Sequence, residues 1–313
     1  MKTRRIKTIL LFLSTMPFIG IYAQSIYYVS PHASSGGDGS PATPFHIIHE
    51  AVEKARKDKN CTTIYLREGE YILDTPLVLT SADGNDSKEL IIRNYPGEKA
   101  IISSGITLDL KWEKYKNGIM RAAVKGNPVM DMLIVNGDLR SMARYPDYDK
   151  TAVRFNGTSA LATAPERVKK WKNPEGGYFH AMHSHDWGDF HYRITGKNEK
   201  GELQLEGGWQ NNRPMGIHPE NRMVENIFEE LDAPGEWYYD KQEGWLYYYP
   251  LSDENINELV FETPQLKNLI EIAGTSSHPV KNITIEGIEL TQTIRTFMEH
   301  YEPLLRSDWT IYR

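Results

Sequence analysis

The chain has 313 residues, of which 40% are hydrophobic and 25% are charged, and its formal net charge is −6. This composition is typical of a folded globular protein, and it excludes a collagen-like chain, a disordered chain and a polytopic membrane protein. The length is sufficient for about two domains with a substantial apolar core.

Residues 1–23 have the organisation of a secretory signal peptide. Basic residues between positions 2 and 7 precede an apolar run over residues 8–22, and Ala23 offers a cleavage site. The run contains Ser, Pro and Gly and is short for a membrane span, so an uncleaved anchor helix is the less favoured alternative. We therefore expect a secreted or periplasmic protein that is cut near Ala23 and has no membrane association afterwards.

Removal of residues 1–23 makes the chain more acidic. The mature chain would have 32 basic and 42 acidic residues, a net charge of −10. An acidic protein without a basic cluster is not expected to bind nucleic acid. Cys61 is the only cysteine, so no internal disulfide can form, and its distance from the cleavage site argues against a lipid anchor. We interpret Cys61 as a small packing residue rather than a nucleophile.

One amphipathic helix is expected near the N-terminus. Residues 26–43 run from a short strand into a loop rich in Gly, Ser, Pro and Asp. Thr43 is a good N-cap, and Pro44 suits the first helical turn. Apolar residues then recur at helical spacing to about Lys57, so the pattern predicts a helix over residues 44–57.

Most of the remaining chain is expected to form short β-strands. The predicted strands cover residues 62–66, 71–73, 77–80, 90–93 and 100–103, and then 269–272, 280–285 and 288–291. Short strands with sharp corners and about 20–25 residues per turn suggest the coils of a parallel β-solenoid. An antiparallel sandwich is the alternative that the spacing leaves open.

Residues 111–261 differ from both flanks. They contain six of the seven Trp, and residues 197–205 and 236–249 resemble hairpins. We therefore expect an antiparallel β domain inserted between two solenoid coils. The predicted organisation is a signal peptide over 1–23, a cap and first coils over 24–110, the insertion over 111–261 and resumed coils over 262–313.

Several blocks of the sequence carry a family resemblance. Those near the start are Tyr27–Pro31 (YYVSP), Pro44-Phe45, Ile64–Tyr71 (IYLREGEY), Tyr95–Lys99 (YPGEK) and Ile101–Gly105 (IISSG). They resemble the opening of exported right-handed parallel β-helix proteins of the pectate-lyase-like type, which degrade polysaccharides.

Further blocks fall within the expected insertion. They are Val135–Gly137 (VNG), Ala143–Pro146 (ARYP), Leu231–Tyr238 (LDAPGEWY) and Leu246–Pro250 (LYYYP). They resemble the insertion domain of glycoside hydrolase family 141, whose members include enzymes acting on α-L-fucosides and xylan. The resemblance implies a right-handed parallel β-helix with an N-terminal cap helix, interrupted by an inserted antiparallel β domain.

The resemblance also implies a function. It implies a secreted or periplasmic glycoside hydrolase of plant-type or fucosylated polysaccharides, without a cofactor and monomeric at full length. Family enzymes carry their catalytic carboxylates on later coils, so we expect this chain to be an N-terminal part that is inactive alone. A polysaccharide lyase of the same fold and a non-catalytic carbohydrate-binding β-helix protein remain as alternatives. A lyase commonly uses Ca²⁺, which an Asp-rich coil face would favour, and no such cluster is visible.

The loop over residues 293–309 is one candidate for a sugar cleft. Hydrolysis of a glycosidic bond usually needs two carboxylates across the bond, and sequence spacing cannot show such a pair. The loop offers three acidic residues, and basic and aromatic residues that could line the cleft, while a packing loop is the alternative. The acidic candidates are Glu299, Glu302 and Asp308, and the lining candidates are Arg295, Arg306, Tyr301 and Trp309.

The densest polar segment is His180–His191 (HAMHSHDWGDFH). His183, His185, Asp186 and Asp189 are candidate sugar ligands, and Trp187 could stack on a pyranose face. If His183 and His185 alternate on a strand, they share a face, which permits two zinc ligands but shows no third. Structural histidines, sugar contacts and a metal site therefore remain open, and we expect no metal.

Acidic residues also gather just before the aromatic hairpin. Glu220, Glu225, Glu229, Glu230 and Asp232 are interpreted as a charged, solvated turn, with a contribution to the cleft as the alternative.

Overall fold

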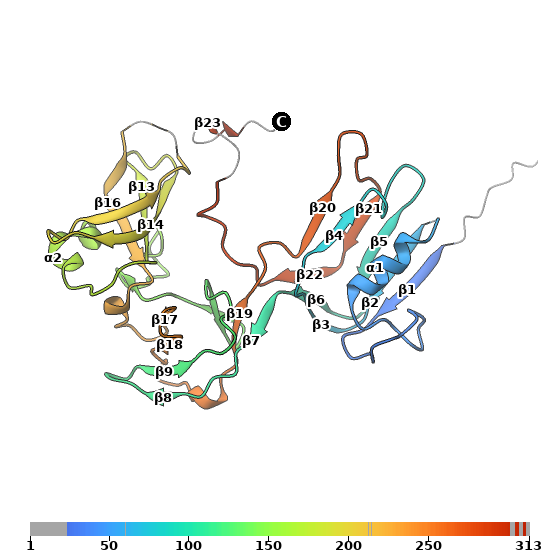
Figure 1. Ribbon diagram of the computed structural model, residues 1–313, viewed down its shortest axis with the longest axis horizontal. Helices are drawn as coiled ribbons and strands as arrows, with labels where there is room; N and C mark the ends of the chain where they lie inside the picture. The colour runs from blue at the N-terminus through green and yellow to red at the C-terminus, as the bar shows by residue number, and fades with distance from the viewer. Residues whose placement is uncertain are drawn as a thin grey trace, which may run out of the picture. The chain divides into compact units, whose positions relative to one another are not determined.

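A computed structural model describes residues 24–59, 61–211, 213, 215–300, 304–306 and 309–310. The expected signal peptide lies outside these ranges. Within them the chain is almost entirely β structure, with α-helices only at α1 (Ile48–Arg56) and α2 (Pro165–Val168) (Figure 1). The predicted all-β fold with an inserted antiparallel domain is confirmed. Neither α-helix of the described ranges has the length and apolar character needed to cross a bilayer.

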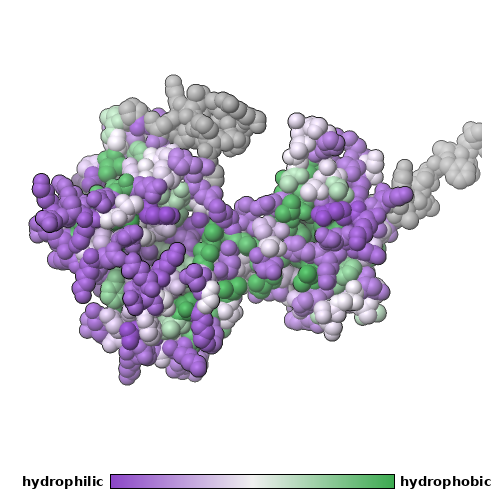
Figure 2. All heavy atoms as spheres, viewed as in Figure 1, coloured by the Kyte–Doolittle hydropathy of each residue, from purple (hydrophilic) through white to green (hydrophobic). Residues whose placement is uncertain are grey.

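The described residues divide into two compact units. The first comprises residues up to Glu68 together with Leu79–Lys99 and Ile272–Gly287, and the second comprises Gly69–Val78, Ala100–Glu271 and the residues from Ile288 onward. Hydrophilic residues cover most of the visible face of both units (Figure 2).

A parallel sheet organises the first unit. Its strands are β1 (Ser25–Val29), β2 (Thr62–Leu66), β5 (Leu90–Asn94) and β21 (Ile283–Glu286), in that order. Ile64 of β2 is level with Ile92 of β5, which is level with Ile285 of β21. Ile64 and Ile92 are fully buried, because alternate side chains of each strand point into the same interior. The sequence pattern of alternating aliphatic residues therefore becomes a stacked core.

Helix α1 is shorter than the sequence predicts, and Thr43 is not its N-cap. The Thr43 hydroxyl instead donates to Asp38 at 2.6 Å, within a turn. Phe45 lies in a parallel bridge with Val29, so the chain is held extended until Ile48. Tertiary pairing with β1 has overridden the local capping signal.

Buried charges hold the C-terminal end of α1. Lys88 is only 8% exposed, and its ammonium donates to the carbonyl oxygens of Ala55 and Arg56 at 2.8 and 3.0 Å and to that of Ala82 at 3.0 Å. Two of these carbonyls belong to the last turn of the helix, where a cation is favourable. The Arg56 guanidinium also pairs with the buried carboxylate of Asp83 at 2.9 Å.

The second unit begins with parallel pairing of the same kind. β3 (Gly69–Ile72), β6 (Ala100–Ser103) and β22 (Ile288–Thr291) form a parallel sheet with β6 in the centre. β4 (Leu77–Thr80) pairs with β20 (Ile270–Ala273), and each of these two strands has residues in both units.

The antiparallel part of the second unit leaves and rejoins the parallel strands at one place. β7 (Gly105–Thr107) pairs antiparallel with β19 (Phe261–Pro264), with Thr107 level with Glu262. The intervening chain therefore departs and returns through neighbouring strands, as an insertion must. β19 continues through β10 (Leu133–Val135) to β11 (Asp138–Arg140) in a four-stranded sheet.

Two further antiparallel sheets build the inserted region. The aromatic sheet has the order β17-β18-β9-β8, and the five-stranded sheet has the order β12-β16-β13-β14-β15. Buried Trp237 and Trp171 stand in two separate hydrophobic clusters, with Tyr248 and Phe261 beside the first and Phe179 beside the second. The strands are β8 (Glu113–Lys114), β9 (Met120–Ala123), β12 (Arg144–Tyr145), β13 (Tyr178–His183), β14 (Asp189–Lys197), β15 (Leu203–Gly207), β16 (Ile217–Glu225), β17 (Trp237–Asp240) and β18 (Trp245–Tyr248). Short 3-10 helices lie at Ala160–Thr163, Phe228–Glu230 and Ile256–Glu258, and a last pair of strands at β23 (Leu304–Arg306) and β24 (Trp309–Thr310).

Candidate functional site

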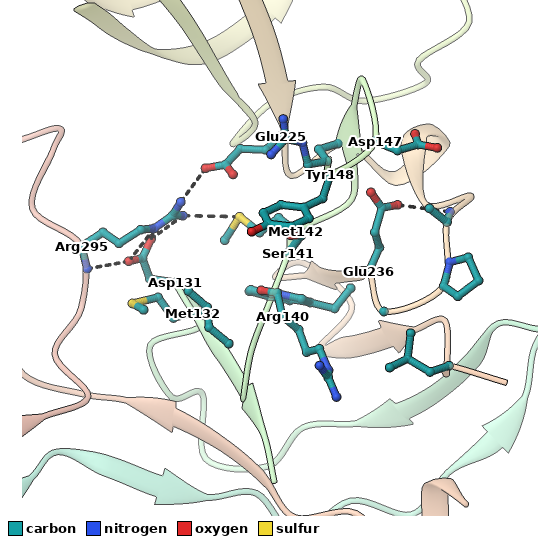
Figure 3. A pocket seen from close by; sticks show the side chains of 17 residues that line it. Asp131, Met132, Arg140, Ser141, Met142, Asp147, Tyr148, Glu225, Glu236 and Arg295 are labelled. Carbon is teal, nitrogen blue, oxygen red and sulfur yellow. Dashed lines mark hydrogen bonds and ion pairs between the residues drawn. The ribbon is translucent and has the colours of Figure 1, made fainter. Parts of the chain in front are cut away.

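The second unit contains a pocket of about 490 Å³ whose walls carry charged side chains. We call it the polar pocket. It is lined by the ends of several antiparallel strands and by the segment that follows β22. Its charged residues are Asp131, Arg140, Arg144, Asp147, Glu225, Glu236 and Arg295. Figure 3 shows Glu225 and Arg295 on one side of the pocket and Glu236 on the other.

Arg295 joins two carboxylates on one wall of the polar pocket. Its guanidinium donates to Asp131 at 3.0 Å and to Glu225 at 2.5 Å, and its backbone N–H donates to Asp131 at 2.8 Å. Burial alone would raise the pKa of Glu225, but the charge of Arg295 and the hydrogen bond to His180 hold that pKa well below its ordinary value. Burial would likewise lower the pKa of Arg295, yet Glu225 and Asp131 raise it. Glu225 is therefore an ionised hydrogen-bond acceptor.

A pair of histidines lies beside Glu225, and one of them contacts its carboxylate. His180 of β13 and His191 of β14 are cross-strand neighbours, and their Nδ1 atoms lie 2.7 Å apart. The Nε2 atom of His180 lies 3.2 Å from Oε1 of Glu225, and Nε2 of His191 lies 3.4 Å from Asp189. Burial lowers the pKa of His180, against the effect of Glu225. An ionised Glu225 requires a donor, so we assign the ring proton of neutral His180 to Nε2.

Glu236 on the opposite wall has a different environment. Its side chain is 2% exposed, and its Oε2 accepts one long hydrogen bond, 3.4 Å, from the N–H of Ala233. Its Oε1 is buried and has no hydrogen-bond partner among the described residues. Burial raises the pKa of Glu236 to about 8, and the nearby charges of Asp147 and Asp232 contribute. Glu236 is therefore mainly protonated at neutral pH.

Arg144 holds the loop over residues 146–157, which forms another part of the wall of the polar pocket. Its guanidinium is 5% exposed and donates to the carbonyl oxygens of Pro146 and Phe155 at 2.8 Å and to that of Gly157 at 3.0 Å. These bonds anchor both ends of the loop. The loop carries Tyr148, whose ring lies between Glu225 and Glu236 in the view of Figure 3.

The structure places the predicted sugar ligands of the His-rich segment at a hairpin turn, away from the polar pocket. β13 ends at His183, so His183 and His185 do not alternate along one strand as the sequence suggested. His183 is buried, and its Nδ1 accepts from the N–H of His185 at 3.1 Å. Asp186 has a positive φ of 57° and accepts from Asn221 at 3.0 Å.

Trp187 is 57% exposed at the same turn, as a sugar-stacking residue would be. It also has a cation and a second ring beside it. The guanidinium of Arg213 lies 4.7 Å from its ring centroid, and the ring of His183 lies parallel to it at 6.0 Å.

The other candidates lie after β22. Glu299 forms an ion pair with Lys267, and its carbonyl accepts from Nε1 of Trp209 at 3.2 Å. Glu299 does not line the polar pocket, whereas Arg295 does. Tyr301, Glu302, Asp308 and the side chains of Arg306 and Trp309 lie outside the described part of the chain.

The acidic stretch before the aromatic hairpin is not the solvated turn that the sequence suggested. Glu230 is 4% exposed and accepts hydrogen bonds from Arg167 and from Nε1 of Trp171, both at 2.6 Å. Glu225 lies in the polar pocket. These two positions were misassigned because their partners come from distant segments, while acidic residues without a visible partner are usually solvated.

The described residues contain no group of three or more His, Cys, Asp or Glu arranged to hold a metal ion. Cys61 is half-buried, and its thiol donates to Glu89 at 3.2 Å. Burial and Glu89 raise the pKa of this thiol to about 11, which disfavours the reactive thiolate.

Comparison with known proteins places the fold but not a family. No model of a known protein family matches the sequence. A curated relative, the uncharacterized protein YwoF of Bacillus subtilis (strain 168), is 34% identical over 88 residues, which are 28% of this chain and 17% of YwoF. A solved structure described as a glycoside hydrolase is similar with a TM-score of 0.70 and 22% identity, over 86% of this chain and 51% of that chain. The complex of XylC with xylose gives a TM-score of 0.40 and 14% identity, over 86% of this chain and 35% of that chain.

The chain thus spans about half the length of the glycoside hydrolase structure and about a sixth of the length of YwoF. The similarity to the glycoside hydrolase extends over most of this chain and supports the all-β architecture described above.

Proposed function

We propose that this chain is part of an exported carbohydrate-active protein, a glycoside hydrolase related to family 141 that acts on plant-type or fucosylated polysaccharides. Its parallel strands would be the first coils of a right-handed β-helix, and its antiparallel region the inserted domain. The sequence blocks that resemble this family and the similarity of fold to a solved glycoside hydrolase support the proposal.

The polar pocket is the observation that carries the proposal. Three guanidinium groups on its walls are matched by three carboxylates, because Glu236 is mainly protonated at neutral pH. A pocket without net charge that offers both donors and acceptors suits an uncharged, hydroxyl-rich ligand. The volume of about 490 Å³ is within the range of small-ligand sites.

The pocket is suited to binding rather than to cleavage. Hydrolysis needs one carboxyl group as acid and another as base or nucleophile. Glu225 is a poor base, because the ion pair with Arg295 lowers its pKa strongly. Glu236 is mainly protonated at neutral pH and is therefore not a base there. We therefore propose that this chain binds sugars and does not hydrolyse them.

Binding of defined oligosaccharides tests this function. We expect the chain to bind xylo-oligosaccharides or fucosylated oligosaccharides in calorimetric titration, without release of reducing sugar. Tyr148→Ala should weaken binding about fivefold, since an aromatic contact contributes roughly 1 kcal/mol. Trp187→Ala is the matched control, because Trp187 is similarly exposed but lies outside the pocket.

Each other outcome has a defined meaning. Loss of binding in Trp187→Ala alone would move the site to the hairpin turn. Release of reducing sugar would contradict the inactive-part proposal, and release of unsaturated uronic acids would indicate a lyase. Absence of binding to any of these glycans would refute the proposal.

Export is a separate part of the proposal. Expression of the whole chain in a Gram-negative host with a periplasm should yield a mature protein that begins at Gln24, which intact-mass measurement would detect. Retention of residues 1–23 in the membrane fraction would favour the anchor alternative.

A further inference from the structure

Glu236 is an unusual carboxyl group because it is buried without a matching partner. At 2% exposure, a carboxylate ordinarily has a cation or several hydrogen-bond donors beside it. Glu236 has one long hydrogen bond from Ala233 and a smaller backbone contribution from Asp232, and its Oε1 has no partner in the described ranges. The side chain nevertheless lines the polar pocket. A polar ligand in the pocket is the missing partner that this arrangement calls for.

The charged groups around Glu236 favour its neutral form. Asp147, on the loop after β12, and Asp232, on the segment before β17, repel a negative charge there. Arg144 of β12 is the nearby cation, but its Nε and Nη2 groups donate to backbone carbonyls of the loop at 146–157 and not to Glu236. No described guanidinium or ammonium therefore pairs with Glu236 itself. A protonated carboxyl group has an O–H to donate.

Glu225, on the opposite wall of the polar pocket, is a hydrogen-bond acceptor rather than a donor. All hydrogen bonds described for the Glu225 side chain fall on Oε1, from His180 and Arg295. Its Oε2 remains as an acceptor for a ligand. A donor carboxyl and an acceptor carboxylate thus line one pocket.

We propose that the polar pocket binds an uncharged sugar through a hydrogen bond donated by the protonated carboxyl of Glu236, with Glu225 accepting from a sugar hydroxyl. This inference rests on the proposed function and specifies the ligand class and the proton that binding requires. Tyr148 is 53% exposed, and its ring lies between the two carboxyl groups in the view of Figure 3, where a bound sugar would contact it. Ionisation of Glu236 removes the donor and places two negative charges in the pocket, so binding is lost at alkaline pH.

A calcium site is the competing explanation for an unpartnered carboxyl group. Calcium takes 6–8 oxygen ligands, whereas no group of three candidate ligands is arranged for a metal in the described residues. The two explanations predict opposite pH dependence, because a cation needs the ionised carboxylate and a sugar hydroxyl needs the protonated acid.

The test is the pH dependence of binding, measured by calorimetry with L-fucose and with xylotriose between pH 6 and pH 9.5. We expect the dissociation constant of the unaltered chain to rise at least tenfold across this range. Glu236→Gln keeps a neutral donor of the same size and cannot ionise, so its dissociation constant should change less than twofold. Asp232→Asn removes a charge near Glu236 without touching the pocket, and should move the midpoint to lower pH.

Three outcomes would overturn the inference. The first is the same pH profile in Glu236→Gln as in the unaltered chain, which would leave sugar binding intact but remove the role of Glu236. The second is binding of Ca²⁺ alone that strengthens with pH and disappears in Glu236→Gln. The third is a lack of binding of either sugar by any variant at any pH, which would overturn the proposed function as well. Thermal unfolding of each variant at pH 6 establishes that it is folded.

Discussion

Two glutamates in the polar pocket show how the surroundings of a residue decide its chemistry. Glu225 and Glu236 both have little exposure, and burial by itself would raise the pKa of each. Glu225 has Arg295 and His180 beside it and is ionised. Glu236 has Asp147 and Asp232 nearby and is mainly protonated at neutral pH. Identical side chains thus act as acceptor and donor in one site.

Glu236 should make stability depend on pH even without a ligand. Its pKa is raised from 4.5 to about 8, so the native state binds this proton more tightly than the unfolded chain does. The corresponding stability is complete below about pH 4.5 and is lost as the pH rises to about 8. A shift of this size corresponds to at most about 5 kcal/mol. We expect Glu236→Gln to have the higher Tm at pH 9 and to lose less Tm than the unaltered chain between pH 5 and pH 9.

The control for this prediction is Glu243→Gln, which makes the same chemical change in an exposed turn. Its Tm should follow the unaltered chain at every pH. Parallel curves for Glu236→Gln and the unaltered chain would show that Glu236 ionises normally in the fold.

The polar pocket could not be predicted from the sequence, because its residues are far apart along the chain. Asp131 and Arg295 are 164 positions apart, and Glu225 is 70 positions from Arg295. Arg295 was expected to line a cleft, but nothing in a single sequence identifies its partners. Glu236 lies in the block LDAPGEWY, and a carboxyl group amid apolar and aromatic residues is the one signal that could have marked it.

At the scale of elements, β13, β14 and β16 bring four titratable side chains into contact. The contacts His180–Glu225, His180–His191 and His191–Asp189 each need one proton between their two atoms. When the ring proton of His180 is on Nε2, toward Glu225, the Nδ1 atom of His180 accepts from Nδ1–H of His191 at 2.7 Å.

The ring proton of neutral His180 should therefore lie on Nε2, toward Glu225. In ¹⁵N-edited NMR of the imidazole rings at pH 6, we expect His180 as the neutral Nε2–H tautomer. In His191→Asn the amide can still donate toward His180, so His180 should remain neutral. A doubly protonated His180 ring at pH 6 in the unaltered chain would contradict the assignment.

Lys88 should be important for the junction between α1 and the segment before β5. Lys88→Met keeps the length of the side chain but leaves three carbonyl oxygens without their donor. Loss of a charged donor to buried groups costs about 2 kcal/mol, which thermal or urea unfolding would detect. Lys54→Met, on the exposed face of α1, should change the free energy of unfolding by less than about 0.5 kcal/mol. Equal effects of the two substitutions would show that the capping contacts do not stabilise the helix.

Strands were easier to predict than the helix start for a physical reason. The residues of β2 and β6 are mostly buried, and both strands coincide with the predicted ranges. The start of α1 depended on whether Thr43 capped a helix or joined the turn with Asp38. That competition is decided by the pairing of Phe45 with Val29, which a local pattern does not contain.

At the scale of the whole molecule, the last parallel strands expose residues whose counterparts are core. Leu290 of β22 is level with Ile102 of β6, yet Leu290 is 52% exposed and Ile102 is fully buried. Ile272 of β20, in the first unit, is 62% exposed. β21 and β22 are terminal strands of their sheets in the described structure. Exposed aliphatic side chains on edge strands favour pairing with another chain.

This chain on its own should therefore self-associate. Light scattering after size-exclusion chromatography should show a mass above 35.9 kDa that increases with protein concentration. Ile272→Lys combined with Leu290→Lys places two charges on these exposed aliphatic positions and should shift the protein toward monomer without lowering its Tm, because neither side chain is buried. Val153→Lys makes a similar change at a position that is 85% exposed and outside these strands, so the association should persist in that variant. A monomeric mass for the unaltered chain at all concentrations would show that the exposed strands do not pair.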